Sequence, residues 1–176
     1  MTKPLVNAWA FALPHRRHFL LAGLWICFLI ALTPGGSGQD APVTALHTGT
    51  KDLGVAYKQL SKDMETVKSA EEFAVAINKL SDAFDKLNAG IAGVLKLPAP
   101  EMGRAIEAMK KIPLDMGPQE DHNAGMTAAE NLAQKFNTSP QAVKAWNRFS
   151  AGVVTTGKLT MQLAAAEKKL NKERHP

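Results

Sequence analysis

The chain has 176 residues, of which 45% are hydrophobic and 21% charged, and its 21 Lys and Arg against 16 Asp and Glu give a formal net charge of +5. The apolar fraction excludes a disordered polyelectrolyte, and 13 Gly and 10 Pro are too few for a fibrous or low-complexity chain. The single Cys excludes an intramolecular disulfide framework and a Cys-rich zinc module. The length allows one domain, with or without a leader.

The N-terminal region contains an apolar run, residues 19–32, without a charged side chain. Arg16, Arg17 and His18 precede the run, and small, turn-forming residues follow it at 33–38. This order is typical of a secretory signal peptide, and the run is shorter than the about 20 residues of a spanning helix. We therefore predict a signal peptide at 1–38, a linker at 39–42 and a periplasmic or secreted protein. The alternative is a retained N-terminal anchor and a single-pass membrane-anchored protein.

The leader carries much of the apparent basicity. Residues 1–38 contain Lys3, Arg16, Arg17 and the only Cys, Cys27, but no acidic residue. The remainder is therefore nearly neutral and has no thiol for a disulfide, a nucleophile or a covalent haem attachment. Binding to nucleic acid requires a concentrated cationic surface, so we expect no nucleic-acid partner.

Two long helices come first in the exported part. Their apolar positions alternate in spacing between four and three residues, which is typical of helices that pack lengthwise in a coiled-coil manner. A capping box joins them, in which the Ser69 hydroxyl accepts from the Glu72 amide and the Glu72 carboxylate accepts from the Ser69 amide. The short connection predicts an antiparallel hairpin. The expected inward positions are Leu46, Thr50, Leu53, Tyr57, Leu60, Met64 and Val67, then Phe73, Ile77, Leu80, Phe84, Leu87, Ile91 and Val94.

Shorter elements follow the hairpin. A helix is predicted at 101–112, with Met102, Ile106 and Met109 on one face, and a loop at 113–126. Residues 127–130 have the pattern of a second capping box, which predicts a short helix starting there. Ser139 and Pro140 then open a last helix that extends to about residue 172, with a bend or break expected at 155–157. The sequence thus predicts an all-α, up-and-down four-helix bundle at 43–173 with a short extra helix.

Candidate ligands are few in the exported part. His47, near the start of the first helix, and His175, after the end of the last, would lie at the same end of an up-and-down bundle, where they could bind a haem iron or a metal. The alternative is that both are solvated terminal residues. His122, in the stretch Glu120-Asp121-His122 with Asp115 nearby, could form a weak metal site, but a solvated loop explains these residues as well. We predict no metal site and no catalytic residue, because no nucleophile stands beside a base.

Short fragments along the chain resemble the cytochrome b562-type periplasmic four-helix bundle. The fragments are Asp52-Leu53, Met64-Glu65-Thr66-Val67, Pro100-Glu101-Met102 and Ala164-Ala165-Ala166-Glu167. In that family a Met early in the first helix and a His late in the fourth hold the haem iron. The resemblance implies that Tyr57 falls where this Met is expected and that His175 would be the His.

Two functions follow from these observations. The first is an exported, non-enzymatic helical bundle without a cofactor, acting as a binding or interaction module for an unknown protein partner in the cell envelope. Such a protein would meet the membrane only through its N-terminal segment, if that segment is not cleaved. The alternative is an electron carrier that binds haem b, with His175 as one axial ligand and His47, Tyr57 or a methionine as the other.

Overall fold

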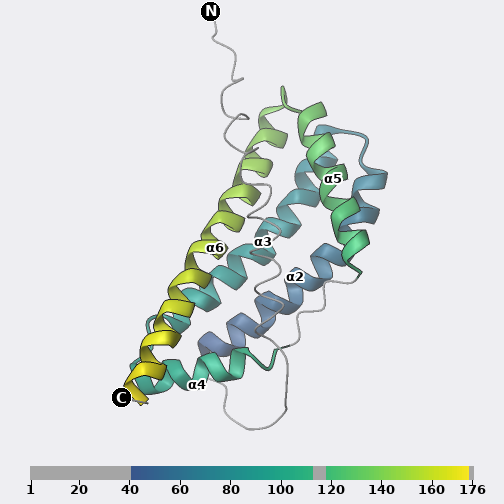
Figure 1. The fold of residues 1–176 in the computed structure, drawn as a ribbon. Coiled ribbons are helices and arrows are strands. Elements are labelled where there is room, and N and C mark those ends of the chain that lie inside the picture. The colour runs from purple at the N-terminus through teal and green to yellow at the C-terminus, as the bar shows by residue number, and fades with distance from the viewer. Residues whose placement is uncertain (1–40, 113–117, 175–176) are drawn as a thin grey trace, which may run out of the picture.

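The computed structural model describes residues 41–112 and 118–174, and these residues form five helices and no strand. The all-α prediction is therefore confirmed for this part of the chain (Figure 1). The predicted signal peptide, residues 39–40 of the linker, residues 113–117 of the loop and His175 lie outside the described residues. The helices are α2 (Ala41–Thr66), α3 (Ala70–Val94), α4 (Ala99–Met109), α5 (Gln119–Lys135) and α6 (Pro140–Arg174).

Helices α2 and α3 form the predicted antiparallel hairpin. Lys86 pairs with Asp52 at 2.6 Å and Lys79 with Asp63 at 3.4 Å, so the residue numbers run in opposite directions along the two helices. All seven positions of α3 that were predicted to face inward are buried. The six predicted inward positions of α2 from Leu46 to Met64 are buried as well. The spacing of apolar residues therefore identified the inward faces of both helices, because neither helix can bury its stripe without the other.

Glycines allow α2 and α3 to approach each other closely. A Cβ built on Gly49 would lie 2.6 Å from the backbone nitrogen of Leu87, and one built on Gly90 would lie 2.6 Å from Cα of Leu46. Both contacts are with backbone atoms, which cannot rotate away as the end of a flexible side chain can. The two glycines therefore set the distance between the helices at the end where α2 begins.

The turn between α2 and α3 contains a variant of the expected capping box. The Ser69 hydroxyl accepts from the Glu72 amide at 3.2 Å, as predicted. The Glu72 carboxylate, however, accepts from the amide of Lys68 at 2.7 Å and not from that of Ser69. The carboxylate thus bonds to the amide one residue before the N-cap.

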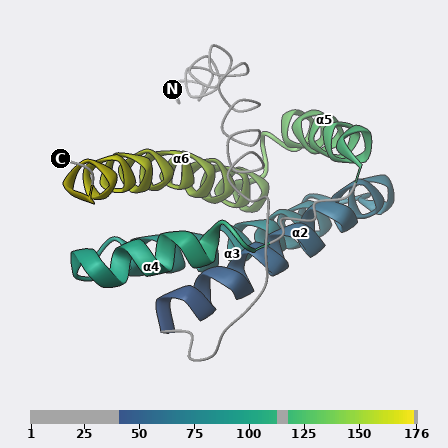
Figure 2. The same ribbon diagram turned by 60° about the horizontal axis from the view of Figure 1, so that its bottom comes forward.

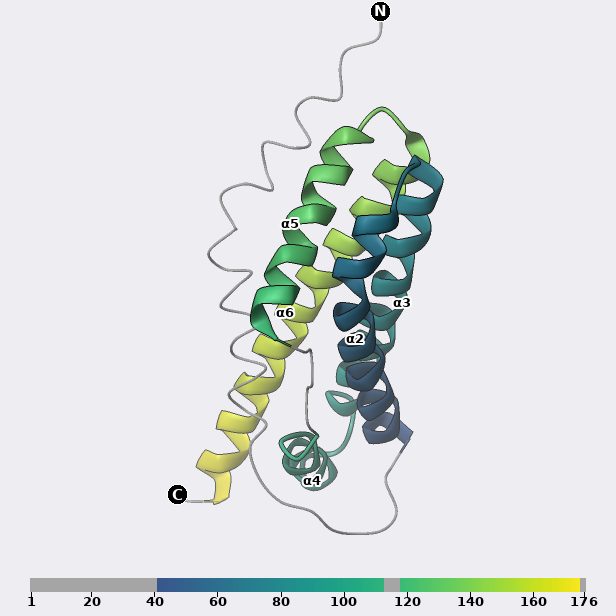
Figure 3. The same ribbon diagram turned by 90° about the vertical axis from the view of Figure 1, so that its right-hand side faces the viewer.

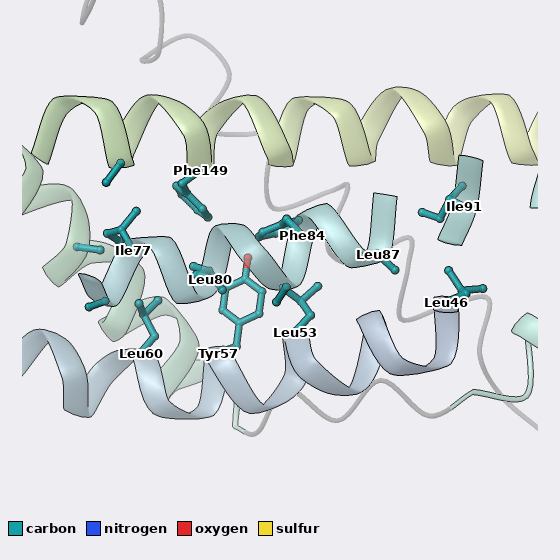
Figure 4. Close-up of a cluster of buried hydrophobic side chains, with 14 of the residues drawn as sticks. Leu46, Leu53, Tyr57, Leu60, Ile77, Leu80, Phe84, Leu87, Ile91 and Phe149 are labelled. Carbon is teal, nitrogen blue, oxygen red and sulfur yellow. The ribbon is translucent and has the colours of Figure 1, made fainter. Parts of the chain in front are cut away.

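Helix α6 packs alongside α3 in a parallel orientation. The Asn88 side-chain amide donates to the Gly152 carbonyl at 3.1 Å, and the Thr156 hydroxyl donates to Asn88 Oδ1 at 2.8 Å. Phe84 and Phe149 form an edge-on pair above these bonds, with ring centroids 5.8 Å apart (Figure 4). This buried polar group links the middle of α3 to the middle of α6.

Of the bend or break predicted at 155–157 in the last helix, the break is wrong, because α6 continues from Pro140 to Arg174. The Thr155 hydroxyl donates to the Ala151 carbonyl, and the Thr156 hydroxyl shares its one proton between the Gly152 carbonyl and Asn88 Oδ1. These bonds satisfy the threonine side chains within the helix. Gly157 costs helix propensity, but packing of α6 along α3 outweighs that cost.

Helix α5 begins at Gln119, so the loop predicted at 113–126 and the capping box predicted at 127–130 are wrong for residues 119–130. Its buried residues are small, namely Gly125, Ala129 and Ala133. A Cβ on Gly125 would lie 2.9 Å from the backbone nitrogen of Ser61 in α2. Helix α5 therefore packs closely on α2 through residues that carry almost no hydrophobic signal.

Helices α2, α3, α5 and α6 alternate in direction along the chain, but their neighbours differ from those of a simple up-and-down bundle, in which each helix packs beside the next one. His122 contacts Tyr57 and Gly125 contacts Ser61, so α5 runs parallel to α2, just as α6 runs parallel to α3. Helix α3 packs extensively on both α2 and α6, whereas α5 packs mainly on α2 (Figure 3). The long connection through α4 makes this order possible, since α4 lies across the end of the molecule where α2 begins and α6 ends (Figure 2).

Candidate functional site: an apolar cavity beneath α4

The residues predicted as haem ligands are not brought together in the described part of the chain. His47 is exposed on the surface of α2, whereas Tyr57 is buried. They lie ten residues apart in one helix, which is about 15 Å along its axis, and each was predicted as an alternative second ligand beside His175. His175, the third candidate, lies outside the described residues.

Tyr57 is part of the packed core. Its ring lies edge-on to Phe84, with centroids 6.1 Å apart, and 4.2 Å from the ring of His122. Its hydroxyl points toward α3 and α6 (Figure 4). Burial raises the pKa of Tyr57 above its ordinary value, so the phenol stays protonated. Phe84 and His122 therefore pack against the ring of Tyr57 from two sides of the core.

His122 lies in the first turn of α5, half-buried against Tyr57, and not in a solvated loop as predicted. Its Nδ1 is buried without a hydrogen-bond partner, and burial lowers the pKa of the imidazole. Among residues 41–112 and 118–174, no group of three or more His, Cys, Asp or Glu side chains gathers where it could hold a metal ion. Glu120 and Asp121, also grouped with His122 in the weak metal site, are exposed in the first turn of α5, and Asp115 lies outside the described range.

An apolar cavity lies where α4 crosses the end of the long helices. Its volume is about 80 Å³, and aliphatic side chains from α2, α3, α4 and α6 surround it. Such a volume exceeds the roughly 15 Å³ that one water molecule requires. The apolar lining residues are Leu46, Leu87, Ile91, Ile106, Met109, Ile112, Leu163 and Ala164.

The polar groups around the cavity are already engaged. The Thr50 hydroxyl donates to the Leu46 carbonyl at 2.9 Å within α2. Lys110 pairs with Glu167 of α6 at 2.6 Å and with Glu107 of α4 at 2.9 Å. The hydrogen bonds that Lys110 donates to the carboxylates of Glu167 and Glu107 raise its pKa, so it is fully cationic at neutral pH. The Lys110–Glu167 pair therefore ties the end of α4 to α6 at the edge of the cavity.

The short helix α4 provides one wall of the cavity. It begins after Pro98 and has its first turn at Ala99 and Pro100, where proline is well tolerated. Its predicted apolar face is confirmed in that Ile106 is buried and Met102 and Met109 are partly buried against the core. The sequence carried no sign of the empty volume itself, because the volume depends on how far α4 stands from α2 and α6.

The cavity can accept a small apolar group but offers no chemistry, since its lining has no unengaged nucleophile or base. No family model, curated protein or solved structure matches the chain. In the part that the structure describes, every helix is too short or too polar to cross a membrane.

Proposed function

We propose that this chain is an exported, non-enzymatic helical protein that acts as a binding module in the cell envelope. Its framework would be a four-helix bundle formed by α2, α3, α5 and α6, preceded by a signal peptide at 1–38. The apolar cavity beneath α4 supports the proposal, because an aliphatic pocket can hold an apolar side chain that a partner protein inserts as an anchor.

The weak attachment of α4 favours binding at this place. Helix α4 has 11 residues, only Gly103, Ala105 and Ile106 of which are buried, and residues 110–118 separate it from α5. Outward movement of α4 would break one ion pair between helices, Lys110–Glu167, and would enlarge the cavity. A partly exposed ion pair of this kind contributes on the order of 1 kcal/mol, so a bound apolar anchor could offset this cost.

Site-specific photo-crosslinking in intact cells tests the proposal. A photoreactive side chain at Met109, which lines the cavity, should give a discrete adduct with an envelope protein. The same group at the exposed Val75 on α3 should not. Filling the cavity with Ile106→Phe should abolish the Met109 adduct, whereas Arg104→Gln, on the exposed side of the same helix, should leave it unchanged. Equal crosslinking from both positions would contradict the proposal.

The absorption spectrum of the chain in the presence of haem tests the alternative function, that of a haem-binding electron carrier. The purified chain mixed with haem should show only the spectrum of free haem. A sharp Soret band that is lost in His175→Ala would instead establish a haem-binding protein and overturn the proposal.

A further inference from the structure

The charged residues of the helices are unequally distributed between the two ends of the molecule. We divide the helices into two halves along the long axis of the molecule, at the height of the Asp52–Lys86 pair. Helix α6 passes this height near residue 154. The half that contains α4 has eleven basic residues against five acidic ones, and the other half has seven against nine. The basic residues of the α4 half are Lys51, Lys86, Lys96, Arg104, Lys110, Lys111, Lys158, Lys168, Lys169, Lys172 and Arg174.

The acidic residues of the α4 half are largely neutralised. Asp52 pairs with Lys86, and both Glu107 and Glu167 pair with Lys110. Lys51, Lys96, Arg104, Lys111 and the four lysines of α6 are exposed, and they face only Glu101 and Glu173 as further acids in this half. The nearly neutral helical region therefore has one strongly cationic end.

Helix α6 concentrates this charge on one side. We call the exposed face of α6 between Val154 and Lys172 the outer stripe of α6. This stripe contains no acidic residue and spans about 27 Å of the helix. Two large apolar side chains lie within it, Val154 with 47% and Met161 with 76% of its surface exposed. Met161 is the most exposed large hydrophobic residue in the described part of the chain. The stripe consists of Val154, Lys158, Met161, Ala165, Lys168, Lys169 and Lys172, all exposed.

We propose that the outer stripe of α6 docks on an anionic phospholipid surface. Lysines beside exposed apolar side chains on one helical face match the two parts of such a surface, its charged headgroups and the acyl boundary beneath them. The attachment of the rest of the chain agrees with this occupant. Ala41, the first residue of α2, lies at the cationic end, so the preceding residues with their apolar run at 19–32 join the molecule there. This docking is independent of the cavity beneath α4.

Partition of the full chain between buffer and vesicles tests the proposal. The vesicles are either pure phosphatidylcholine or the same lipid with about 30% phosphatidylglycerol. Any contribution of the uncharged run at 19–32 enters both measurements, so the ratio of the two partition coefficients reports the charge-dependent part. We expect this ratio to fall at least about tenfold in a variant with Lys158, Lys168, Lys169 and Lys172 changed to Gln.

Matched variants control for net charge and for exposed apolar surface. Changing Lys62, Lys68, Lys135 and Lys144 of the other half to Gln removes the same charge and should lower the ratio less than about twofold. Met161→Ser should weaken binding to the anionic vesicles, whereas Val75→Ser, which alters an exposed residue of α3, should not. Equal partition of the unaltered chain into both vesicle types would overturn the proposal. So would equal losses in the two lysine variants, or tighter binding to duplex DNA than to the vesicles.

Discussion

Gly90 and Gly157 show that the effect of a helical glycine depends on what surrounds it. A Cβ on Gly157 would meet no atom within 4 Å, whereas one on Gly90 would collide with the backbone of Leu46. Gly157→Ala should therefore raise the free energy of unfolding by about 1 kcal/mol through helix propensity alone. Gly90→Ala should lower it by about 1–3 kcal/mol, because α2 and α3 must separate. Urea denaturation of both variants measures these changes, and stabilisation by Gly90→Ala would contradict the close approach of the helices.

The imidazole of His122 makes the stability depend on pH. Because burial lowers its folded-state pKa below the ordinary value, the unfolded chain binds this proton more readily as the pH falls. The contribution of neutral His122 is fully present above about pH 6.5 and is lost as the pH falls toward the lowered pKa, by at most about 1.4 kcal/mol per pH unit. His122→Leu should therefore lose less stability than the unaltered chain between about pH 7.5 and about pH 5.5.

Urea unfolding of both proteins at the two pH values tests this prediction. Carboxylates common to both proteins affect the two equally, so the difference between the two losses isolates His122. Identical losses would show that the imidazole is hydrated in the folded state, contrary to its contact with Tyr57.

At the level of elements, the bonds among Asn88, Thr156 and Gly152 set the register of α3 against α6. Asn88→Leu and Thr156→Val should each lower the free energy of unfolding, since each change leaves a buried polar group without its partner. The double variant should lose less free energy of unfolding than the sum of the two single losses, because the two residues share one bond. The difference, the coupling free energy, should be about 0.5–3 kcal/mol. A double-mutant cycle measured by urea denaturation gives this value. Strict additivity would mean that the Thr156–Asn88 bond contributes nothing.

The elements differ in how far the sequence revealed them. The inward faces of α2 and α3 were predictable because large apolar residues recur on them at helical spacing. Helix α5 was predicted to begin too late, because its inward face contains His122, Gly125 and Ala129 in place of large aliphatic residues. Thr127 and Glu130 have the spacing of a capping box but lie inside this helix, where the backbone is already hydrogen-bonded.

The candidate site was less predictable than the helices. Ile106 and Met109 were correctly placed on the inward face of α4, but an apolar face has the same pattern whether it fills its space or leaves a cavity. The net charge of the chain does not reveal the cationic end for a similar reason. Lys111 and Lys168 are far apart in sequence, and only the return of α6 to the end where α4 lies places them in the same half.

At the level of the whole molecule, the five helices should differ in how often they open. Helix α3 lies between α2 and α6 and buries 13 of its 25 residues, whereas α4 and α5 each bury three residues, all small except Ile106. Local opening requires least free energy where few apolar contacts are lost. Amide hydrogen exchange should therefore be slowest in α3, intermediate in the parts of α2 and α6 that face it, and fastest in α4 and the first turns of α5.

Exchange measured under native conditions, with peptides resolved for each helix, tests this order. Lys110→Ala removes the ion pair between α4 and α6, so it should speed exchange in α4 and leave the rates in α3 unchanged. Lys111→Ala, at the neighbouring exposed residue, is the matched control and should change neither rate. Exchange of α4 and α3 at one common rate would mean that the cavity wall opens only when the whole domain unfolds. Binding beneath α4 could then use only the volume already present, about 80 Å³, and not an enlarged one.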